Sequence, residues 1–396
     1  MQQFSPAPWK YASPLRLASL LRRLAGMAIL VAATVACATE ATPAAQPQLT
    51  EETSPTVWPA TAAPTVTSEA VPPSPAVTVI PTASASTPAG TVTSIAPVLT
   101  ETEAPVSVAN LLSGTWSEGA TMPTARSEMP AAELGGLIYV PGGFGGEQAV
   151  EAYDPVADRW HILAPMPEGR HHLMAAASGD RLYIFGGGRG ATWEPTATAW
   201  AYDPASDSWT ELAPMPEPRM SGAAIALDGH LYIVGGVGGS QALLRYDPAA
   251  DSWVALASLQ AAREHTAAVA VDGQIYALAG RWSDTGELNT VETYDPASDT
   301  WTAGSPLDVP RGGLAATVLQ GHILVAGGEV IISGRETLDG VELFDPASET
   351  WQLAPPLPVT LHGVPAVVVD DTVYVLGGSD RAAAAENRGR VLIYRP

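Results

Sequence analysis

The sequence predicts an all-β repeat protein in which a four-stranded antiparallel unit occurs six times. Six tryptophans lie 44 to 50 residues apart, and each precedes a glycine-type pair by 26 residues. A tyrosine or phenylalanine stands seven residues before five of them, and an arginine stands ten residues after five of them. Fixed offsets at such a period indicate a repeat architecture. The tryptophans are Trp116, Trp160, Trp209, Trp253, Trp301 and Trp351.

One copy of the unit, residues 202–236, shows how each part predicts a strand or a turn. The small apolar residues 223–227 are typical of a strand that is buried on both faces. Asp228-Gly229 favours the positive φ angles of a two-residue hairpin. Residues 231–234 are rich in β-forming side chains and end at a glycine pair. The Asp-Pro sequence after the tyrosine favours a type I turn that leads into the tryptophan strand.

These features resemble kelch repeats over roughly residues 109–396. The resemblance implies a β-propeller, in which each repeat forms one sheet around a central channel. Trp116 has no tyrosine strand before it, and residues 392–396 form a tyrosine strand with no tryptophan after it. We therefore expect a closed ring of six blades, with the sixth completed by the N-terminal strand around Trp116.

The segments before the propeller predict export and a spacer. Residues 1–37 place four basic residues before a short apolar stretch and resemble a bacterial lipoprotein signal peptide. Cys37, the single cysteine, stands where such proteins carry their lipid, although Thr-Val-Ala precedes it where Leu-Ala-Gly is typical. Cleavage after Ala38, which would give a secreted protein, is the alternative. Residues 38–108 are rich in Thr, Pro and Ala and predict a disordered linker.

The charge of the chain narrows the classes of partner. Removal of the signal peptide takes away four of the 19 basic residues and leaves 41 acidic ones, a net charge of −26. Such an acidic surface disfavours nucleic acid and anionic lipid headgroups. We therefore expect no nucleic-acid partner, contact with a membrane only through a lipid anchor, and a monomer.

Two tryptophans outside the repeat pattern are candidate ligand contacts. They lie in the connections between second and third strands, which vary in length and share one face of the expected ring with the fourth-to-first connections. Variable loops on a rigid scaffold commonly carry binding sites. An Arg–Trp pair can stack on a sugar ring or an aromatic group, whereas packing on a neighbouring blade would be structural. The pairs are Trp193 with Arg189 and Trp282 with Arg281.

A second candidate set lies two residues after the repeated arginine, where the kelch resemblance implies a ligand-binding rim. It consists of Glu128, His172 and His265, with His362 adjacent to the corresponding place in the last copy. No metal site and no cofactor are predicted, because imidazoles on different blades can lie too far apart and the spacings typical of zinc ligands are absent. The repeated arginines are interpreted as structural, with hydrogen bonds to carbonyls or carboxylates between blades.

The interpretation that follows is a surface-anchored, non-catalytic kelch propeller that binds a glycan, peptide or protein through its long-loop face. An extracytoplasmic carbohydrate-active enzyme, mutarotase- or epimerase-like, is the alternative, because Glu128 and the histidines can act as acids and bases at the channel mouth. Kelch-type copper oxidases need a Cys–Tyr crosslink, which a propeller without cysteine cannot form. A scaffold of an envelope complex is the third possibility, and the fold alone does not choose between them.

Overall fold

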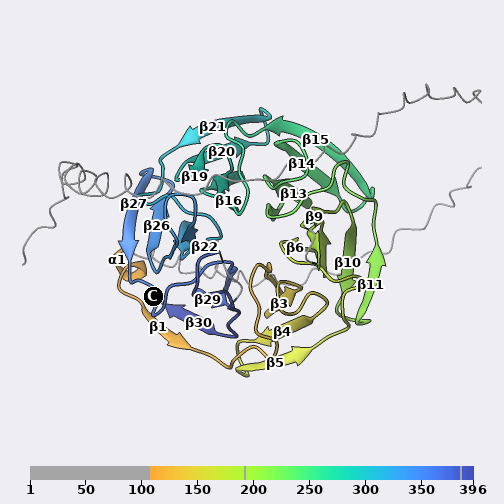
Figure 1. Ribbon diagram of the computed structural model, residues 1–396, viewed down its shortest axis with the longest axis horizontal. Helices are drawn as coiled ribbons and strands as arrows, with labels where there is room; N and C mark the ends of the chain where they lie inside the picture. Colours follow the sequence, from red (N-terminus) through yellow and green to blue (C-terminus); the bar gives the residue numbers. More distant parts are fainter. Residues whose placement is uncertain (1–107, 191–192, 384–385) are drawn as a thin grey trace, which may run out of the picture. The chain divides into compact units, whose positions relative to one another are not determined.

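The computed structural model describes residues 108–190, 193–383 and 386–396, which form six four-stranded antiparallel sheets around a central channel (Figure 1). The predicted six-bladed propeller is confirmed. The expected signal peptide, Cys37 and residues 38–107 of the expected linker lie outside the described residues. Among the residues that are described, no helix has the length and apolar character needed to cross a membrane.

Each blade is a meander whose first strand lies nearest the channel and whose last lies at the rim (Figure 1). The strands of blades 1 to 3, from channel to rim, are β2 (Ala132–Leu134), β3 (Leu137–Pro141), β4 (Val150–Asp154) and β5 (Arg159–Ile162); β6 (Met174–Ser178), β7 (Arg181–Phe185), β10 (Ala199–Asp203) and β11 (Ser208–Glu211); and β12 (Ala223–Leu227), β13 (His230–Val234), β14 (Ala242–Asp247) and β15 (Ser252–Ser258). Those of blades 4 to 6 are β16 (Ala267–Val271), β17 (Gln274–Leu278), β20 (Val291–Asp295) and β21 (Thr300–Gly304); β22 (Ala315–Leu319), β23 (His322–Ala326), β26 (Val341–Asp345) and β27 (Thr350–Ala354); and β28 (Ala366–Val369), β29 (Thr372–Leu376), β30 (Val391–Arg395) and β1 (Thr115–Glu118).

Among the described residues, the long connections between second and third strands form small hairpins in three blades. These hairpins are β8 (Gly188–Arg189) with β9 (Glu194–Pro195), β18 (Arg281–Trp282) with β19 (Gly286–Glu287), and β24 (Glu329–Val330) with β25 (Glu336–Thr337). Single bridges join their first strands to the fourth-to-first connections, as between His171 and Gly188. The two sets of long loops therefore share one face of the ring, which we call the long-loop face.

The ring closes through the N-terminal strand, as the sequence predicted. Strand β1 pairs with β30 in blade 6, with Trp116 opposite Tyr394. The Trp116 Nε1–H donates to the carbonyl of Pro355 in blade 5 at 2.9 Å. The Tyr394 hydroxyl donates to the carbonyl of Leu111, in the short helix α1 (Val108–Leu111), at 2.6 Å. Segments from the two ends of the propeller thus complete one sheet.

The repeated tryptophans connect neighbouring blades. All six indole N–H groups donate to a backbone carbonyl of the preceding blade, at 2.8 to 3.1 Å. Each indole also packs beside the tyrosine or phenylalanine of its own blade, with ring centroids 4.8 to 5.2 Å apart. The core accordingly consists of six apolar clusters, each shared by two adjacent blades.

The repeated arginines are buried, but their side chains bind within their own blade. The Arg263 guanidinium donates to the carbonyls of Ala279 and Thr290 at 3.0 and 2.9 Å and to Glu292 at 2.6 Å. The expectation of arginine side-chain bonds between blades is therefore wrong. The link between blades uses the arginine carbonyl instead, as where Gly187 N–H donates to Arg219 O at 2.9 Å.

Candidate functional site

A closed ring of six backbone hydrogen bonds surrounds the channel near the long-loop face. In each blade, the second residue after the arginine position donates its N–H to the carbonyl of the equivalent residue in the preceding blade, at 2.7 to 2.9 Å. All six residues have positive φ, between 46° and 62°, which is strained for any residue except glycine. Strain of this kind is concentrated at functional sites. The six are Glu128, His172, Ser221, His265, Gly313 and Gly363.

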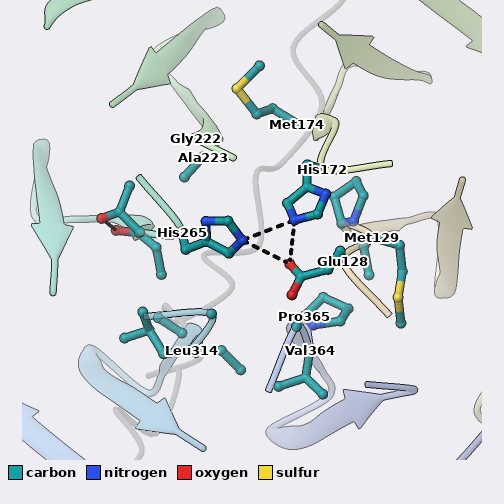
Figure 2. Close-up of a pocket in the computed structure, with 18 of the residues that line it drawn as sticks. Glu128, Met129, His172, Met174, Gly222, Ala223, His265, Leu314, Val364 and Pro365 are labelled. Atoms are coloured by element: carbon teal, nitrogen blue, oxygen red, sulfur yellow. Dashed lines mark hydrogen bonds and ion pairs between the residues drawn. The ribbon is translucent and has the colours of Figure 1, made fainter. Parts of the chain in front are cut away.

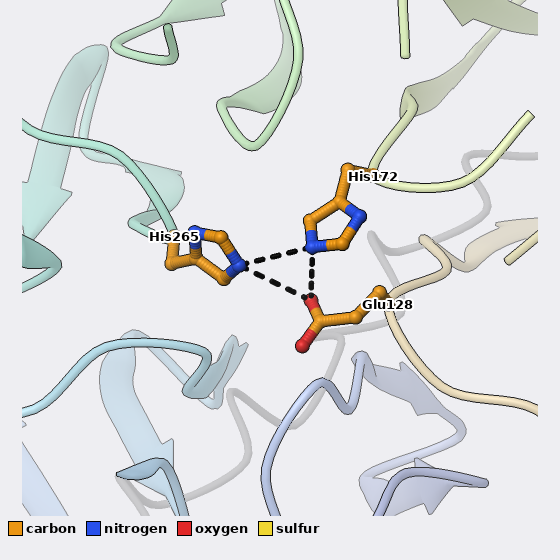
Figure 3. Close-up of side chains that lie close together, drawn as sticks. All are labelled: Glu128, His172 and His265. Carbon is orange, nitrogen blue, oxygen red and sulfur yellow. Dashed lines mark hydrogen bonds and ion pairs between the residues drawn. The ribbon is translucent and has the colours of Figure 1, made fainter. Parts of the chain in front are cut away.

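Three side chains from this backbone ring meet near the channel axis (Figure 3). The Nε2 atoms of His172 and His265 are 3.0 Å apart. Glu128 Oε2 lies 3.4 Å from the Nε2 of His172 and 3.8 Å from that of His265. The expectation that imidazoles on different blades lie too far apart to act together is therefore wrong. We call these three residues the axial triad.

Hydrogen bonds behind the two imidazoles fix which nitrogen atoms face each other. His171 Nε2–H donates to the Gly190 carbonyl at 2.8 Å, so the Nδ1 of neutral His171 can accept the Nδ1–H of His172 at 2.7 Å. His265 Nδ1 lies against a Glu264 carboxylate oxygen, which can only accept a hydrogen bond. When both imidazoles are neutral, their protons therefore point away from the channel axis, and the Nε2 lone pairs of His172 and His265 point toward it.

Further charged side chains surround the axial triad. The Arg281 guanidinium donates to Glu264 Oε1 at 2.8 Å and to Glu329 Oε1 at 2.6 Å. His362 Nδ1 lies 3.4 Å from both Glu128 Oε1 and Glu329 Oε2, and its Nε2–H donates to the Arg381 carbonyl at 2.9 Å. Three carboxylates, from Glu128, Glu264 and Glu329, thus share one guanidinium and the neighbouring imidazoles.

Burial and these neighbours give the ionisable groups of the site different protonation states. Burial acts to raise the pKa of Glu128, but the nearby His172, His265 and His362 outweigh it and hold this pKa well below its usual range. Burial lowers the pKa of His172 well below its usual value, so this imidazole is neutral. Burial also opposes the charged form of His362, yet the Glu128 and Glu329 carboxylates raise its pKa. An anionic carboxylate therefore lies between a neutral and a more basic imidazole.

The axial triad lies between two cavities. One, of about 340 Å³, opens among the loops and is lined by Phe144, Trp193 and Arg281, among others. We call it the mouth pocket. The other, of about 160 Å³, lies toward the channel, and Figure 2 shows the triad pointing into it beside Leu314 and Val364. All three triad residues line both cavities.

One wall of the mouth pocket is aromatic. The Trp193 side chain is 48% exposed, although most large apolar side chains of the propeller are buried. Its ring centroid lies 5.6 Å from that of Phe144, 5.2 Å from that of His171 and 4.8 Å from that of His172. Trp193 also has a positive φ of 55°. These contacts hold a broad aromatic surface at the entrance of the pocket.

The structure brings together six of the eight ligand contacts predicted from the sequence. Those that line the mouth pocket are Glu128, His172, Trp193, His265, Arg281 and His362. Arg189 instead forms an ion pair with Glu168 at 2.9 Å and lines a separate surface hollow. Trp282 lies half-buried in the β18–β19 hairpin and is not among the residues that line the mouth pocket. The loop candidates and the rim candidates therefore contribute to one site.

Sequence reasoning missed Phe144 and Glu329, which also line the mouth pocket. Both stand two residues after the start of a glycine pair, at the repeat position that Arg281 occupies in blade 4. Each of the three forms a single bridge to the residue that precedes a member of the backbone ring. The signal that could have found them is this shared register, which differs from the Arg–Trp pairing that pointed to Arg281.

Comparisons with known proteins agree with this architecture. A model of the kelch motif matches residues 125–167, 169–216, 262–307 and 310–358, which cover blades 1, 2, 4 and 5. No curated protein matches the sequence. Among solved structures, that of YjhT is similar with a TM-score of 0.61, covering 69% of this chain and 94% of that chain at 17% identity. At this identity the likeness concerns the fold.

Proposed function

Because residues 108–396 form a kelch-repeat β-propeller, we propose that the chain is a binding protein that takes a sugar unit of a glycan into the mouth pocket. The observation that carries the proposal is the half-exposed Trp193 ring at a pocket that is also lined by Glu128. Small-ligand sites commonly combine an aromatic lining with a few convergent polar groups. We further propose that a lipid on Cys37 holds the propeller outside the cell membrane, as the N-terminal sequence predicts.

The chemistry of the pocket suits a sugar in two respects. The apolar face of a pyranose ring can stack on the Trp193 indole, which is an amphipathic aromatic surface. The Glu128 carboxylate accepts hydrogen bonds from hydroxyl groups, and the Arg281 guanidinium donates them. A volume of about 340 Å³ is at the small end of ligand pockets, so a sugar unit or the end of a chain enters, whereas a folded partner does not.

Calorimetric titration of the purified chain with a panel of mono- and oligosaccharides tests the proposal. We expect Trp193→Ala to weaken binding at least tenfold, which corresponds to about 1.4 kcal/mol. Trp282→Ala is the matched control, because it removes a loop tryptophan that does not line the mouth pocket and should leave affinity unchanged. Equal affinity in both variants would place the ligand elsewhere, and binding of peptides but no sugars would exclude a glycan.

A second candidate function, a carbohydrate-active enzyme, is favoured by the contact of Glu128 with two imidazoles. A carboxylate and a neutral imidazole within reach of one sugar atom could exchange a proton with it, as a mutarotase or epimerase requires. Exchange spectroscopy by NMR on a sugar that binds would detect interconversion of its anomers or epimers. In an enzyme, Glu128→Gln should abolish turnover and retain binding, whereas in a binding protein no turnover is seen with either form.

A further inference from the structure

We propose that Glu128, His172 and His265 form a binding site for a divalent transition-metal ion such as Zn²⁺. The site rests on the side chains of the axial triad and is independent of whether the mouth pocket takes a sugar. Two imidazoles and one carboxylate are the protein ligands of many zinc sites that keep a fourth position open.

The separations between the donor atoms agree with tetrahedral coordination. Ligand atoms about 2.0 to 2.2 Å from a zinc ion at tetrahedral angles lie about 3.3 to 3.6 Å from one another. The three separations in the axial triad are 3.0, 3.4 and 3.8 Å. Their mean falls within that interval, so shifts of a few tenths of an ångström would bring the three donors into position.

The hydrogen bonds behind the triad direct three lone pairs to one point. In their neutral forms, His172 and His265 turn unprotonated Nε2 atoms toward each other, because their Nδ1 atoms are engaged by His171 and Glu264. The Oε2 atom of Glu128 adds a third acceptor (Figure 3). Acceptors that converge in this way repel one another unless a cation lies between them. Counted together with Glu128, the three carboxylates face one guanidinium and the more basic His362, which leaves an excess of negative charge at the site.

The outer partners have the arrangement that metal sites use to orient their ligands. A histidine that binds a metal usually donates its other N–H to a carboxylate or to another polar group. Glu264 has this role toward His265, and it is itself held by Arg281 at 2.8 Å. His171 has the same role toward His172 and is anchored by the Gly190 carbonyl. Both imidazoles are therefore fixed in orientation before any ion binds.

The backbone conformation also directs these side chains toward the channel axis. Glu128, His172 and His265 adopt positive φ angles of 52°, 54° and 46°, while the equivalent residues of blades 5 and 6 are glycines. The glycine at blade 6 leaves the space that Glu128 uses, because a Cβ on Gly363 would lie 2.6 Å from Glu128 Oε1. A positive φ at a residue other than glycine is costly, and such residues often lie at functional sites.

A second trio, Glu128, Glu329 and His362, also brings three donor atoms close together. Here the His362 Nδ1 faces two carboxylates at 3.4 Å, and its Nε2–H is held by the Arg381 carbonyl. This Nδ1 lies within ion-pair distance of both carboxylates, which favour its protonated form. His362 thus acts as an outer partner that orients Glu128 by its second oxygen.

The test is titration of the full-length, chelator-treated chain with Zn²⁺ alone, followed by calorimetry, and with Co²⁺, followed by visible absorption. We expect one ion per chain and the intense bands of four-coordinate Co²⁺. Glu264→Gln should weaken Zn²⁺ binding about 10- to 100-fold, as loss of an outer partner does. His172→Gln and His265→Gln should weaken it further, and His230→Gln, at the start of strand β13 in blade 3, is the matched control.

Thermal melting of each metal-free variant shows whether it is folded. If a ligand variant does not fold, Glu264→Gln still tests the proposal, because it retains all three ligands. Failure of the wild-type chain to bind Zn²⁺ would overturn the proposal and indicate that a proton lies between the imidazoles. Binding that is equally tight in His265→Gln or in Glu264→Gln would also overturn it, because the ion would then lie elsewhere.

Discussion

Closure of the ring by strand β1 can be tested by removing that strand together with the short helix before it. A chain that begins at residue 119 lacks α1 and β1, whereas a chain that begins at residue 100 retains both. In the shorter chain, β30 becomes an open edge and Tyr394, which is fully buried in the intact ring, becomes exposed. An unprotected edge of this kind also favours aggregation.

The structure sets the size of the expected loss. Deletion removes three hydrogen bonds that involve Trp116 or Tyr394, at 2.6 to 3.1 Å, each contributing about 1 kcal/mol. It also removes the burial of Leu111, which is about 2 kcal/mol, and an aromatic contact at 5.0 Å that adds about 1 kcal/mol. The total of about 6 kcal/mol is comparable with the whole stability of many domains.

Thermal melting followed by circular dichroism compares the two chains. A loss of this size in a domain of nearly 300 residues should lower the melting temperature by about 10 °C or more. If the shorter chain does not fold, a peptide of residues 106–119 added in trans should restore the native spectrum. Equal melting temperatures of the two chains would refute the closure model.

Two further predictions concern the repeat itself. Gly186→Ala should lower the free energy of unfolding by about 3 kcal/mol, because the new Cβ would lie 2.1 Å from Arg219 O. Gly229→Ala has open space around it and should cost about 1 kcal/mol through its positive φ alone. Urea unfolding measures both differences. Hydrogen bonds from a tyrosine hydroxyl and then a backbone N–H hold the pKa values of Asp158, Asp207 and Asp251 below their usual range. Their stabilisation is therefore present above the unfolded pKa of about 3.9 and is lost as the pH falls through the folded pKa. The triple Asp→Asn variant should melt below wild type at pH 7 and converge with it near pH 2, and a constant difference at both pH values would contradict this assignment.

The fold could be predicted from the sequence because each repeated residue makes the same contact in every copy. The tryptophans all donate to a carbonyl of the preceding blade, so their spacing equals one blade. The unpaired strands at the two ends predicted the closure for the same reason. The sequence predicted correctly that the arginines are structural, but it predicted the wrong hydrogen-bond partners for their side chains. A residue pattern does not reveal whether a long side chain bonds within its own sheet or to the next one.

The candidate site was harder to predict because its geometry depends on the ring and not on any single repeat. Glu128, His172 and His265 are 44 and 93 residues apart in sequence and belong to three blades. Only the radius of the channel and the positive φ of the backbone ring decide that their side chains meet. Trp193 could be noticed as an extra aromatic residue, but its contact with His172 required the fold of the β8–β9 hairpin.

The backbone ring at the channel mouth explains how the side chain at this repeat position can differ from blade to blade while the ring stays closed. Its six hydrogen bonds use main-chain atoms only, so they form with any side chain, and the positive φ adds strain at every residue except glycine. The arginine position two residues earlier is different, because its guanidinium holds the second and third strands of the blade together. Five blades accordingly keep arginine there, while the ring carries glutamate, histidine, serine and glycine. Polar and titratable side chains can therefore occupy the ring position, where backbone hydrogen bonds join the blades. In this chain they form the acceptor cluster of the axial triad.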